Sequence, residues 1–133
     1  MIVLDASVVL KWLLPEKESE KALQYRDAHR EGIEHIVVPT LLFYEVANVL
    51  RLQTEIHDEA LHEIFEIFDQ LGITVLHSTF TEFEETIRYA RSKNISVYDA
   101  TYIVLAKRLG CDFVTADTKL VLAADEETVR LLA

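Results

Sequence analysis

The chain has 133 residues, 50% of them hydrophobic, with 13 basic and 23 acidic side chains and a formal net charge of −10. This length suits a single domain over residues 1–133, and the apolar content is sufficient for a core. No run of about 18 apolar residues is present, so the sequence predicts no membrane span.

The acidic balance has the wrong sign for binding nucleic acid through general electrostatics. Carboxylates gathered around a bound cation would also count in this total, so the net charge alone leaves the partner open. No basic segment precedes the apolar run after Met1, which argues against a signal peptide. The single Cys111 cannot form an internal disulfide, and we expect a cytoplasmic protein.

Short apolar runs alternate with amphipathic segments along the chain. The apolar runs predict strands at residues 2–4, 36–38, 73–76, 112–115 and 128–132. The amphipathic segments predict helices at residues 6–14, 16–32, 40–53, 57–71, 79–93 and 97–109, with a further helix beginning after Asp117. This alternation is typical of a mostly parallel α/β sheet with helices on both faces.

Three of these helices carry specific expectations. Pro39 suits the beginning of the helix at 40–53, where its missing N–H does no harm. The helix at 79–93 is expected to contribute apolar side chains to the core, namely Phe80, Phe83, Ile87, Tyr89 and Ala90. The stripe around Phe68 in the helix at 57–71 is expected to lie in the core or to form part of a groove for a partner.

Three aspartates lie where a predicted strand ends or a helix begins. Asp5 follows the first strand, Asp117 follows the fourth, and Asp99 lies in the first turn of a helix that Ser96 can cap. Sites in parallel α/β sheets form outside the carboxyl ends of the strands. An aspartate at a helix start is also an ordinary cap, and Glu45, midway along a helix, can be an edge position beside an apolar stripe. Spacing alone leaves both interpretations open.

The residue types in this set indicate one kind of chemistry. Carboxylates placed together repel one another unless a cation holds them. Oxygen ligands without a His or Cys set favour Mg²⁺ or Mn²⁺ over zinc, and such ions suit phosphate substrates. The chain has no glycine-rich phosphate loop and no nucleophile motif, which argues against kinases and Ser or Cys hydrolases. The pattern therefore favours metal-assisted phosphodiester hydrolysis.

Four segments spread over nearly the whole chain resemble the PIN-domain family, most closely its VapC-type toxins from prokaryotic toxin–antitoxin pairs. They are IVLDASVVLKWLLPE at residues 2–16, YEVANVL at 44–50, VYDATYIVLAKRLG at 97–110 and FVTADTKL at 113–120. The resemblance implies a three-layer α/β/α sandwich with a mostly parallel central sheet. It also implies an endoribonuclease that depends on Mg²⁺ or Mn²⁺ and hydrolyses RNA phosphodiester bonds.

The same resemblance assigns residues to roles. Asp5, Glu45, Asp99 and Asp117 correspond to the family's catalytic and metal-binding quartet. Asp5 and Asp99 would bind the main ion directly, Asp117 would act through water or a second ion, and Glu45 would orient or deprotonate the attacking water or join a second metal site. The hydroxyl residues expected to support this site are Ser7 and Thr115, and the side chains expected to contact the RNA backbone are Lys11, Arg51, Lys107, Arg108 and Lys119.

One departure from the family concerns the second ion. Many members carry another acid or Asn within a turn of the fourth position, where this chain offers Lys119 and Val121, so the number of ions stays open. The resemblance further implies a cognate antitoxin, a homodimer, and inhibition of translation or growth. The alternative is a catalytically weak PIN-like metal-binding module that acts by binding protein or RNA.

Overall fold

The computed structural model describes all residues, 1–133, and contains five strands and seven helices. The strands are β1 (Ile2–Leu4), β2 (Ile36–Pro39), β3 (Thr74–Leu76), β4 (Asp112–Thr115) and β5 (Val129–Leu131). The helices are α1 (Ala6–Leu13), α2 (Ser19–Arg30), α3 (Leu41–Arg51), α4 (Asp58–Leu71), α5 (Phe80–Lys93), α6 (Val97–Leu109) and α7 (Thr118–Ala124).

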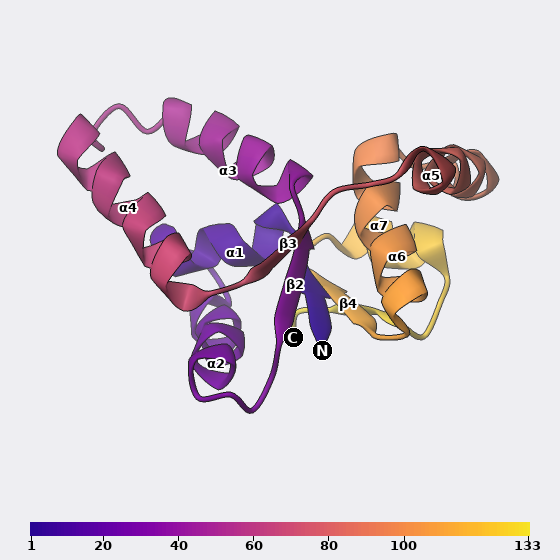
Figure 1. The fold of residues 1–133 in the computed structure, drawn as a ribbon, viewed down its shortest axis with the longest axis horizontal. Coiled ribbons are helices and arrows are strands. Elements are labelled where there is room, and N and C mark those ends of the chain that lie inside the picture. Colours follow the sequence, from indigo (N-terminus) through magenta and orange to yellow (C-terminus); the bar gives the residue numbers. More distant parts are fainter.

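All five strands belong to one parallel sheet in the order β3-β2-β1-β4-β5. Helices α1 to α4 cover one face of this sheet, and α5 to α7 cover the other (Figure 1). The expected three-layer α/β/α sandwich is therefore confirmed, here with an entirely parallel sheet. None of the helices combines the length and the apolar character that crossing a membrane requires.

The central strands are buried because they are covered on both faces. Every residue of β1 and of β2 is buried, which explains their continuous apolar sequence. Helix α6 has seven consecutive buried residues, 100–106, because it packs between the sheet and α5. Because α6 is buried on two sides, its sequence is apolar without a clear polar face. The same packing fixes the position of the first turn of the helix.

The strand order creates a switch point between β1 and β4. From β1 the chain adds β2 and β3 on one side, and it later returns to add β4 and β5 on the other. The register pairs Leu4 with Val114, so Asp5 and Thr115 come next at the same edge of the sheet. A crevice outside the carboxyl ends of two such strands is the usual position of a site in this kind of fold.

The prediction for Pro39 is wrong: it is the last residue of β2, and α3 begins at Leu41. Pro39 pairs with Leu76 of β3. The missing N–H of Pro39 leaves no hydrogen bond to β1 unmade, because the pairing of β2 with β1 ends at Val37.

The prediction for the helix at 79–93 is confirmed only in part, because three of its five residues lie outside the core. Phe80 is 90% exposed, and Phe83 and Ile87 are more than 40% exposed. Ala90 is buried and Tyr89 packs against the core, as predicted. Helix α5 also buries Thr86, and it contacts α6 extensively. The stripe on α4 is divided: Phe68 is buried in the core, and its neighbours on the helix are partly exposed.

Candidate functional site

Asp5 lies where β1 ends and α1 begins, and its side chain is almost fully buried. One carboxylate oxygen, Oδ1, accepts hydrogen bonds from the Ser7 hydroxyl at 2.5 Å and from the backbone N–H of Val8 at 3.3 Å. The other oxygen, Oδ2, accepts a hydrogen bond from the Thr115 hydroxyl at 2.5 Å. Both oxygens of this carboxylate are therefore held in place by the chain.

Ser7 and Thr115 connect the ends of β1 and β4. The Ser7 hydroxyl also accepts a hydrogen bond from the N–H of Ala116 at 2.9 Å. The Thr115 hydroxyl accepts one from the N–H of Asp117 at 3.1 Å. Each hydroxyl thus donates to Asp5 and accepts from the backbone after β4, which locks the two strand ends together.

The other two aspartates lie at helix starts. Asp117 is the N-cap of α7 and accepts a hydrogen bond from the N–H of Leu120 at 3.2 Å. Asp99 lies in the first turn of α6, and its own N–H donates to the Ser96 hydroxyl at 3.0 Å. Asp117 is exposed and Asp99 is half-buried, and the charge of Asp117 acts on Asp99, so the two carboxylates lie near each other.

Glu45 reaches the same region from α3. It is half-buried, and its Oε1 accepts a hydrogen bond from the hydroxyl of Tyr102 on α6 at 2.5 Å. Tyr102 is 1% exposed, and its ring stacks on Phe113 of β4 with 5.7 Å between ring centroids. Glu45 is therefore directed into the protein and is not a solvent-facing edge residue of its helix.

The four carboxylates interact through their charges. Burial raises the pKa of Asp5 to about 6; its three hydrogen bonds oppose this rise, and the charge of Glu45 adds to it. Burial raises the pKa of Glu45, the hydrogen bond from Tyr102 opposes the rise, and the charge of Asp99 adds to it. Burial also raises the pKa of Asp99, and the charge of Asp117 adds to this effect. The pKa values of Asp5, Glu45 and Asp99 are thus each raised in part by the charge of a neighbouring acid.

No basic side chain neutralises this cluster: none of the four carboxylates takes part in an ion pair. The donors are all oxygen atoms, which suits Mg²⁺ or Mn²⁺. No group of three or more His, Cys, Asp or Glu side chains is arranged to hold a metal ion. Mg²⁺ commonly binds proteins through one or two carboxylates and keeps several waters, so a cage of three carboxylates is not a requirement.

Two of the predicted RNA-contacting residues lie away from the acids. Lys107 and Arg108 are at the carboxyl end of α6, about 12 Å along the helix axis from Asp99 at 1.5 Å per residue. Lys107 pairs with Glu126 at 2.6 Å, and Arg108 pairs with Glu85 at 3.1 Å and with a second glutamate of α5. The structure does not bring these two side chains to the carboxylates.

The other three predicted RNA contacts differ in their freedom. Lys11 binds Glu16 at 3.2 Å, and its side chain is largely buried. Arg51 is exposed and donates a hydrogen bond to Asn48 at 3.3 Å. Lys119 is exposed in the first turn of α7, near Asp117, and makes no ion pair. Lys119 is therefore the basic side chain of this group that is both close to an acid of the site and free.

Tyr102 is the functional residue that the sequence did not reveal. Its place in the apolar run of α6 predicts a core aromatic residue, and the ring is indeed in the core. The available signal is its spacing: Tyr102 follows Asp99 by three residues, which puts both side chains on one face of the helix. A tyrosine buried in a core needs a partner for its hydroxyl, and here Glu45 is that partner.

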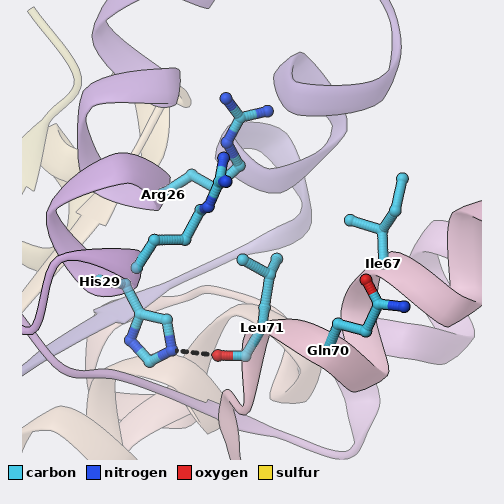
Figure 2. A pocket seen from close by; sticks show the side chains of 6 residues that line it. Arg26, His29, Ile67, Gln70 and Leu71 are labelled. Atoms are coloured by element: carbon cyan, nitrogen blue, oxygen red, sulfur yellow. Dashed lines mark hydrogen bonds between the residues drawn. The ribbon is translucent and has the colours of Figure 1, made fainter.

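Two surface hollows have different positions relative to the acids. One of about 400 Å³ has Tyr44 and Tyr98 in its lining, the residues just before Glu45 and Asp99. The other, of about 500 Å³, lies between α2 and α4 and is lined by Arg26, His29, Arg30, Ile67, Gln70 and Leu71 (Figure 2). His29 accepts a hydrogen bond from the N–H of Ile36, the first residue of β2, so this second hollow lies at the opposite edge of the sheet.

The fold and the carboxylates together define an α/β protein whose acidic site, at the carboxyl edge of a parallel sheet, is not neutralised by any basic side chain. The sequence model of the PIN-domain family matches residues 2–126 of this chain. The chain belongs to the PIN-domain family.

Individual relatives agree with this assignment. Ribonuclease VapC3 of Pyrobaculum aerophilum is 32% identical over 126 residues, which cover 90% of this chain and 91% of that protein. The crystal structure of Mycobacterium tuberculosis VapC20, described as a Sarcin-Ricin loop cleaving toxin, has a TM-score of 0.70 and 16% identity over 98% of this chain and 99% of that one. FitAcB from Neisseria gonorrhoeae has a TM-score of 0.63 and 21% identity over 98% of this chain and 96% of that one.

Proposed function

We propose that this chain is an endoribonuclease that uses Mg²⁺ or Mn²⁺ to hydrolyse RNA phosphodiester bonds, and that it is the toxin of a toxin–antitoxin pair. The observation that carries the proposal is a run of four acids, Asp5, Glu45, Asp99 and Asp117, in which the charge of one raises the pKa of the next and none forms an ion pair. A divalent cation would relieve this repulsion. The relation to VapC3, which is named a ribonuclease, supports RNA as the substrate.

Within this proposal Asp5 and Asp99 are the direct metal ligands, and Asp117 binds through water or assists a second ion. A bound Mg²⁺ or Mn²⁺ supplies positive charge that stabilises the negative charge developing on the phosphate. Ser7 and Thr115 fix the orientation of Asp5 through their hydroxyl groups.

Glu45 handles the proton of the attacking water in this scheme. Its raised pKa brings it closer to the working pH, as general acid–base catalysis requires. The exposed Lys119 is placed to contact an RNA phosphate near Asp117, and such contacts position the substrate without reading its sequence.

The test is cleavage of a mixed, structured RNA pool by purified protein in Mg²⁺, in Mn²⁺ and in EDTA. We expect metal-dependent cuts that disappear in EDTA and that are almost absent with Asp5→Asn or Asp99→Asn. The matched control is Asp112→Asn: Asp112 is at the amino end of β4, where it pairs with Arg130, and its loss should leave cleavage unchanged.

Each other outcome has a clear meaning. Cleavage that survives Asp5→Asn would refute the assigned site. Protein free of any bound inhibitor that cuts in neither metal would refute the nuclease and favour the metal-binding module.

The proposal includes two protein partners. An antitoxin that inserts an arginine between the carboxylates would be attracted strongly, because guanidinium and carboxylate form charge-assisted, often bidentate, hydrogen bonds. If this is right, expression of the chain arrests growth, expression of Asp5→Asn does not, and the cognate antitoxin restores growth. Growth arrest by the Asp5→Asn variant would argue against toxicity through RNA cleavage.

A second copy of the chain is the other partner. Phe80, Phe83 and Ile87 on α5 and Val75 and Leu76 on the edge strand β3 are exposed apolar side chains, which is typical of a protein interface. We expect a homodimer in sedimentation, converted to a monomer by Phe83→Glu but not by Leu122→Glu on the exposed side of α7. A wild-type monomer at all concentrations would refute this part of the proposal.

A further inference from the structure

The hydroxyl of Tyr102 makes a side-chain contact between the two helical layers of the protein. Tyr102 belongs to α6 and Glu45 to α3, and these helices lie on opposite faces of the sheet (Figure 1). The hydroxyl donates to Glu45 Oε1 at 2.5 Å. The hydrogen bond therefore passes from one layer to the other at the carboxyl edge of the sheet, where the acids lie.

The tyrosine is held rigidly on its own side of this contact. Its side chain is 1% exposed, and its ring is nearly parallel to that of Phe113, with an interplanar angle of 10°. Its backbone lies one turn after Asp99 in a helix whose residues 100–106 are all buried. The position of the hydroxyl is thus set by the core and does not depend on a mobile surface group.

Glu45 is held less completely than Asp5. Asp5 has hydrogen bonds to both of its carboxylate oxygens, whereas Glu45 has one, from Tyr102 to Oε1, and its Oε2 makes none within the chain. A glutamate has one more rotatable bond than an aspartate, so it loses more side-chain entropy when it is fixed. The hydroxyl of Tyr102 is the group that limits this freedom.

We propose that Tyr102 is a positioning residue: its hydroxyl fixes Oε1 of Glu45 so that Oε2 is presented to the acidic site beside Asp5 and Asp99. This inference rests on the proposed function, since it concerns the same site. Burial and the hydrogen bond to Glu45 raise the pKa of Tyr102 above its usual range, so the hydroxyl stays protonated and donates at neutral pH. Tyr102 then acts through Glu45 and takes no part in the proton transfer.

The first test is Tyr102→Phe, which removes the hydroxyl and retains the ring on Phe113. We expect single-turnover RNA cleavage at saturating enzyme to slow about tenfold, because a hydrogen bond to a charged group is lost. The concentration of enzyme at half-saturation should stay unchanged, since the RNA is not touched. Mn²⁺ affinity, measured by electron paramagnetic resonance without RNA, should weaken several-fold, because the negative charge of Glu45 is no longer fixed beside Asp5 and Asp99, the residues proposed to bind the ion.

The matched control is Tyr89→Phe. Tyr89 on α5 also donates its hydroxyl to a carboxylate, that of Glu126, but away from the acids of the site. Its removal is the same chemical change in another part of the protein. We expect the cleavage rate and the Mn²⁺ affinity of this variant to equal those of the wild type.

The second test places Tyr102→Phe in a Glu45→Ala background. If Tyr102 acts through Glu45, the second substitution has no further effect on cleavage or on Mn²⁺ affinity. It should also restore stability to the Glu45→Ala protein in urea unfolding, because it removes a buried hydroxyl that has lost its acceptor. A purely structural tyrosine would lower activity equally in both backgrounds.

The outcomes separate this inference from the proposed function. Wild-type protein that cuts RNA, with a Tyr102→Phe variant equal to it in rate and in Mn²⁺ affinity, overturns the role of Tyr102 alone. Wild-type protein that binds Mn²⁺ but cuts no RNA overturns the proposed function, and the Mn²⁺ affinities still decide on Tyr102. Wild-type protein that does neither overturns both.

Discussion

The buried charge of Asp5 should destabilise the protein when no metal is bound. The environment raises the pKa of Asp5 from 3.8 to about 6. At 1.36 kcal/mol per pKa unit, this difference corresponds to about 3 kcal/mol of folding free energy. Below pH 3.8, Asp5 is protonated in both the folded and the unfolded state, and its contribution to the free energy of unfolding is fully present. This contribution is lost as the pH rises through about 6, because the folded state must then carry the buried charge.

Asp5→Asn should therefore stabilise the metal-free protein at pH 7.5. The gain will be smaller than 3 kcal/mol because an amide has one acceptor oxygen, whereas Ser7 and Thr115 donate to two different oxygens of Asp5. One hydroxyl then loses its acceptor, at a cost of about 1–2 kcal/mol. We expect a net stabilisation of about 1–2 kcal/mol above pH 6, shrinking and reversing as the pH falls towards 4.

The assay is urea unfolding of the wild type and Asp5→Asn in EDTA at several pH values between 4 and 7.5. The difference between the two proteins isolates the titration of Asp5 from that of the other acids. Added Mg²⁺ should then stabilise the wild type and have little effect on the variant. A variant that is less stable than the wild type by the same amount at every pH would refute the reasoning.

Three further substitutions test the support of the site and the core. Thr115→Val removes the hydroxyl that donates to Asp5 and should cost about 1–3 kcal/mol in urea unfolding, with Thr115→Ser much closer to the wild type. Ser96→Ala removes the cap that receives the N–H of Asp99 and should cost about 1 kcal/mol in thermal unfolding; an unchanged melting temperature would mean that water replaces the cap. Phe68→Ala should cost about 3–5 kcal/mol by calorimetry, because this side chain lies in the aromatic part of the core.

Much of the fold could be predicted because the central strands have a distinctive sequence. A strand covered on both faces is continuously apolar, as in β1 and β2, and each is followed by polar residues that begin a helix. Asp5, Asp99 and Asp117 could be located from the sequence because helix starts and strand ends are indicated by the residues next to them. The resemblance to a family then united them with Glu45.

The parts that could not be predicted depend on contacts between distant segments. The stripe on α5 has the spacing of a core face, but its large residues Phe80, Phe83 and Ile87 stay exposed. The fully buried positions of this helix are the small residues Thr86 and Ala90. Lys107 and Arg108 pair with acids far away in the sequence. The partner of Tyr102, 57 residues away, is likewise invisible to any local pattern.

The hydrogen bonds by which the Ser7 and Thr115 hydroxyls join the ends of β1 and β4 have a consequence for synthesis of the protein on the ribosome. Asp5 is made first, but Thr115, one of its hydrogen-bond donors, is 110 residues further on. A nascent chain that ends before β4 also lacks Asp117 and the strand that forms one side of the crevice. Contacts between such distant residues form late and slowly. The acidic site is therefore completed only after β4 and Asp117 have emerged, and a shorter nascent chain carries Asp5, Glu45 and Asp99 without the crevice that brings them together with Asp117.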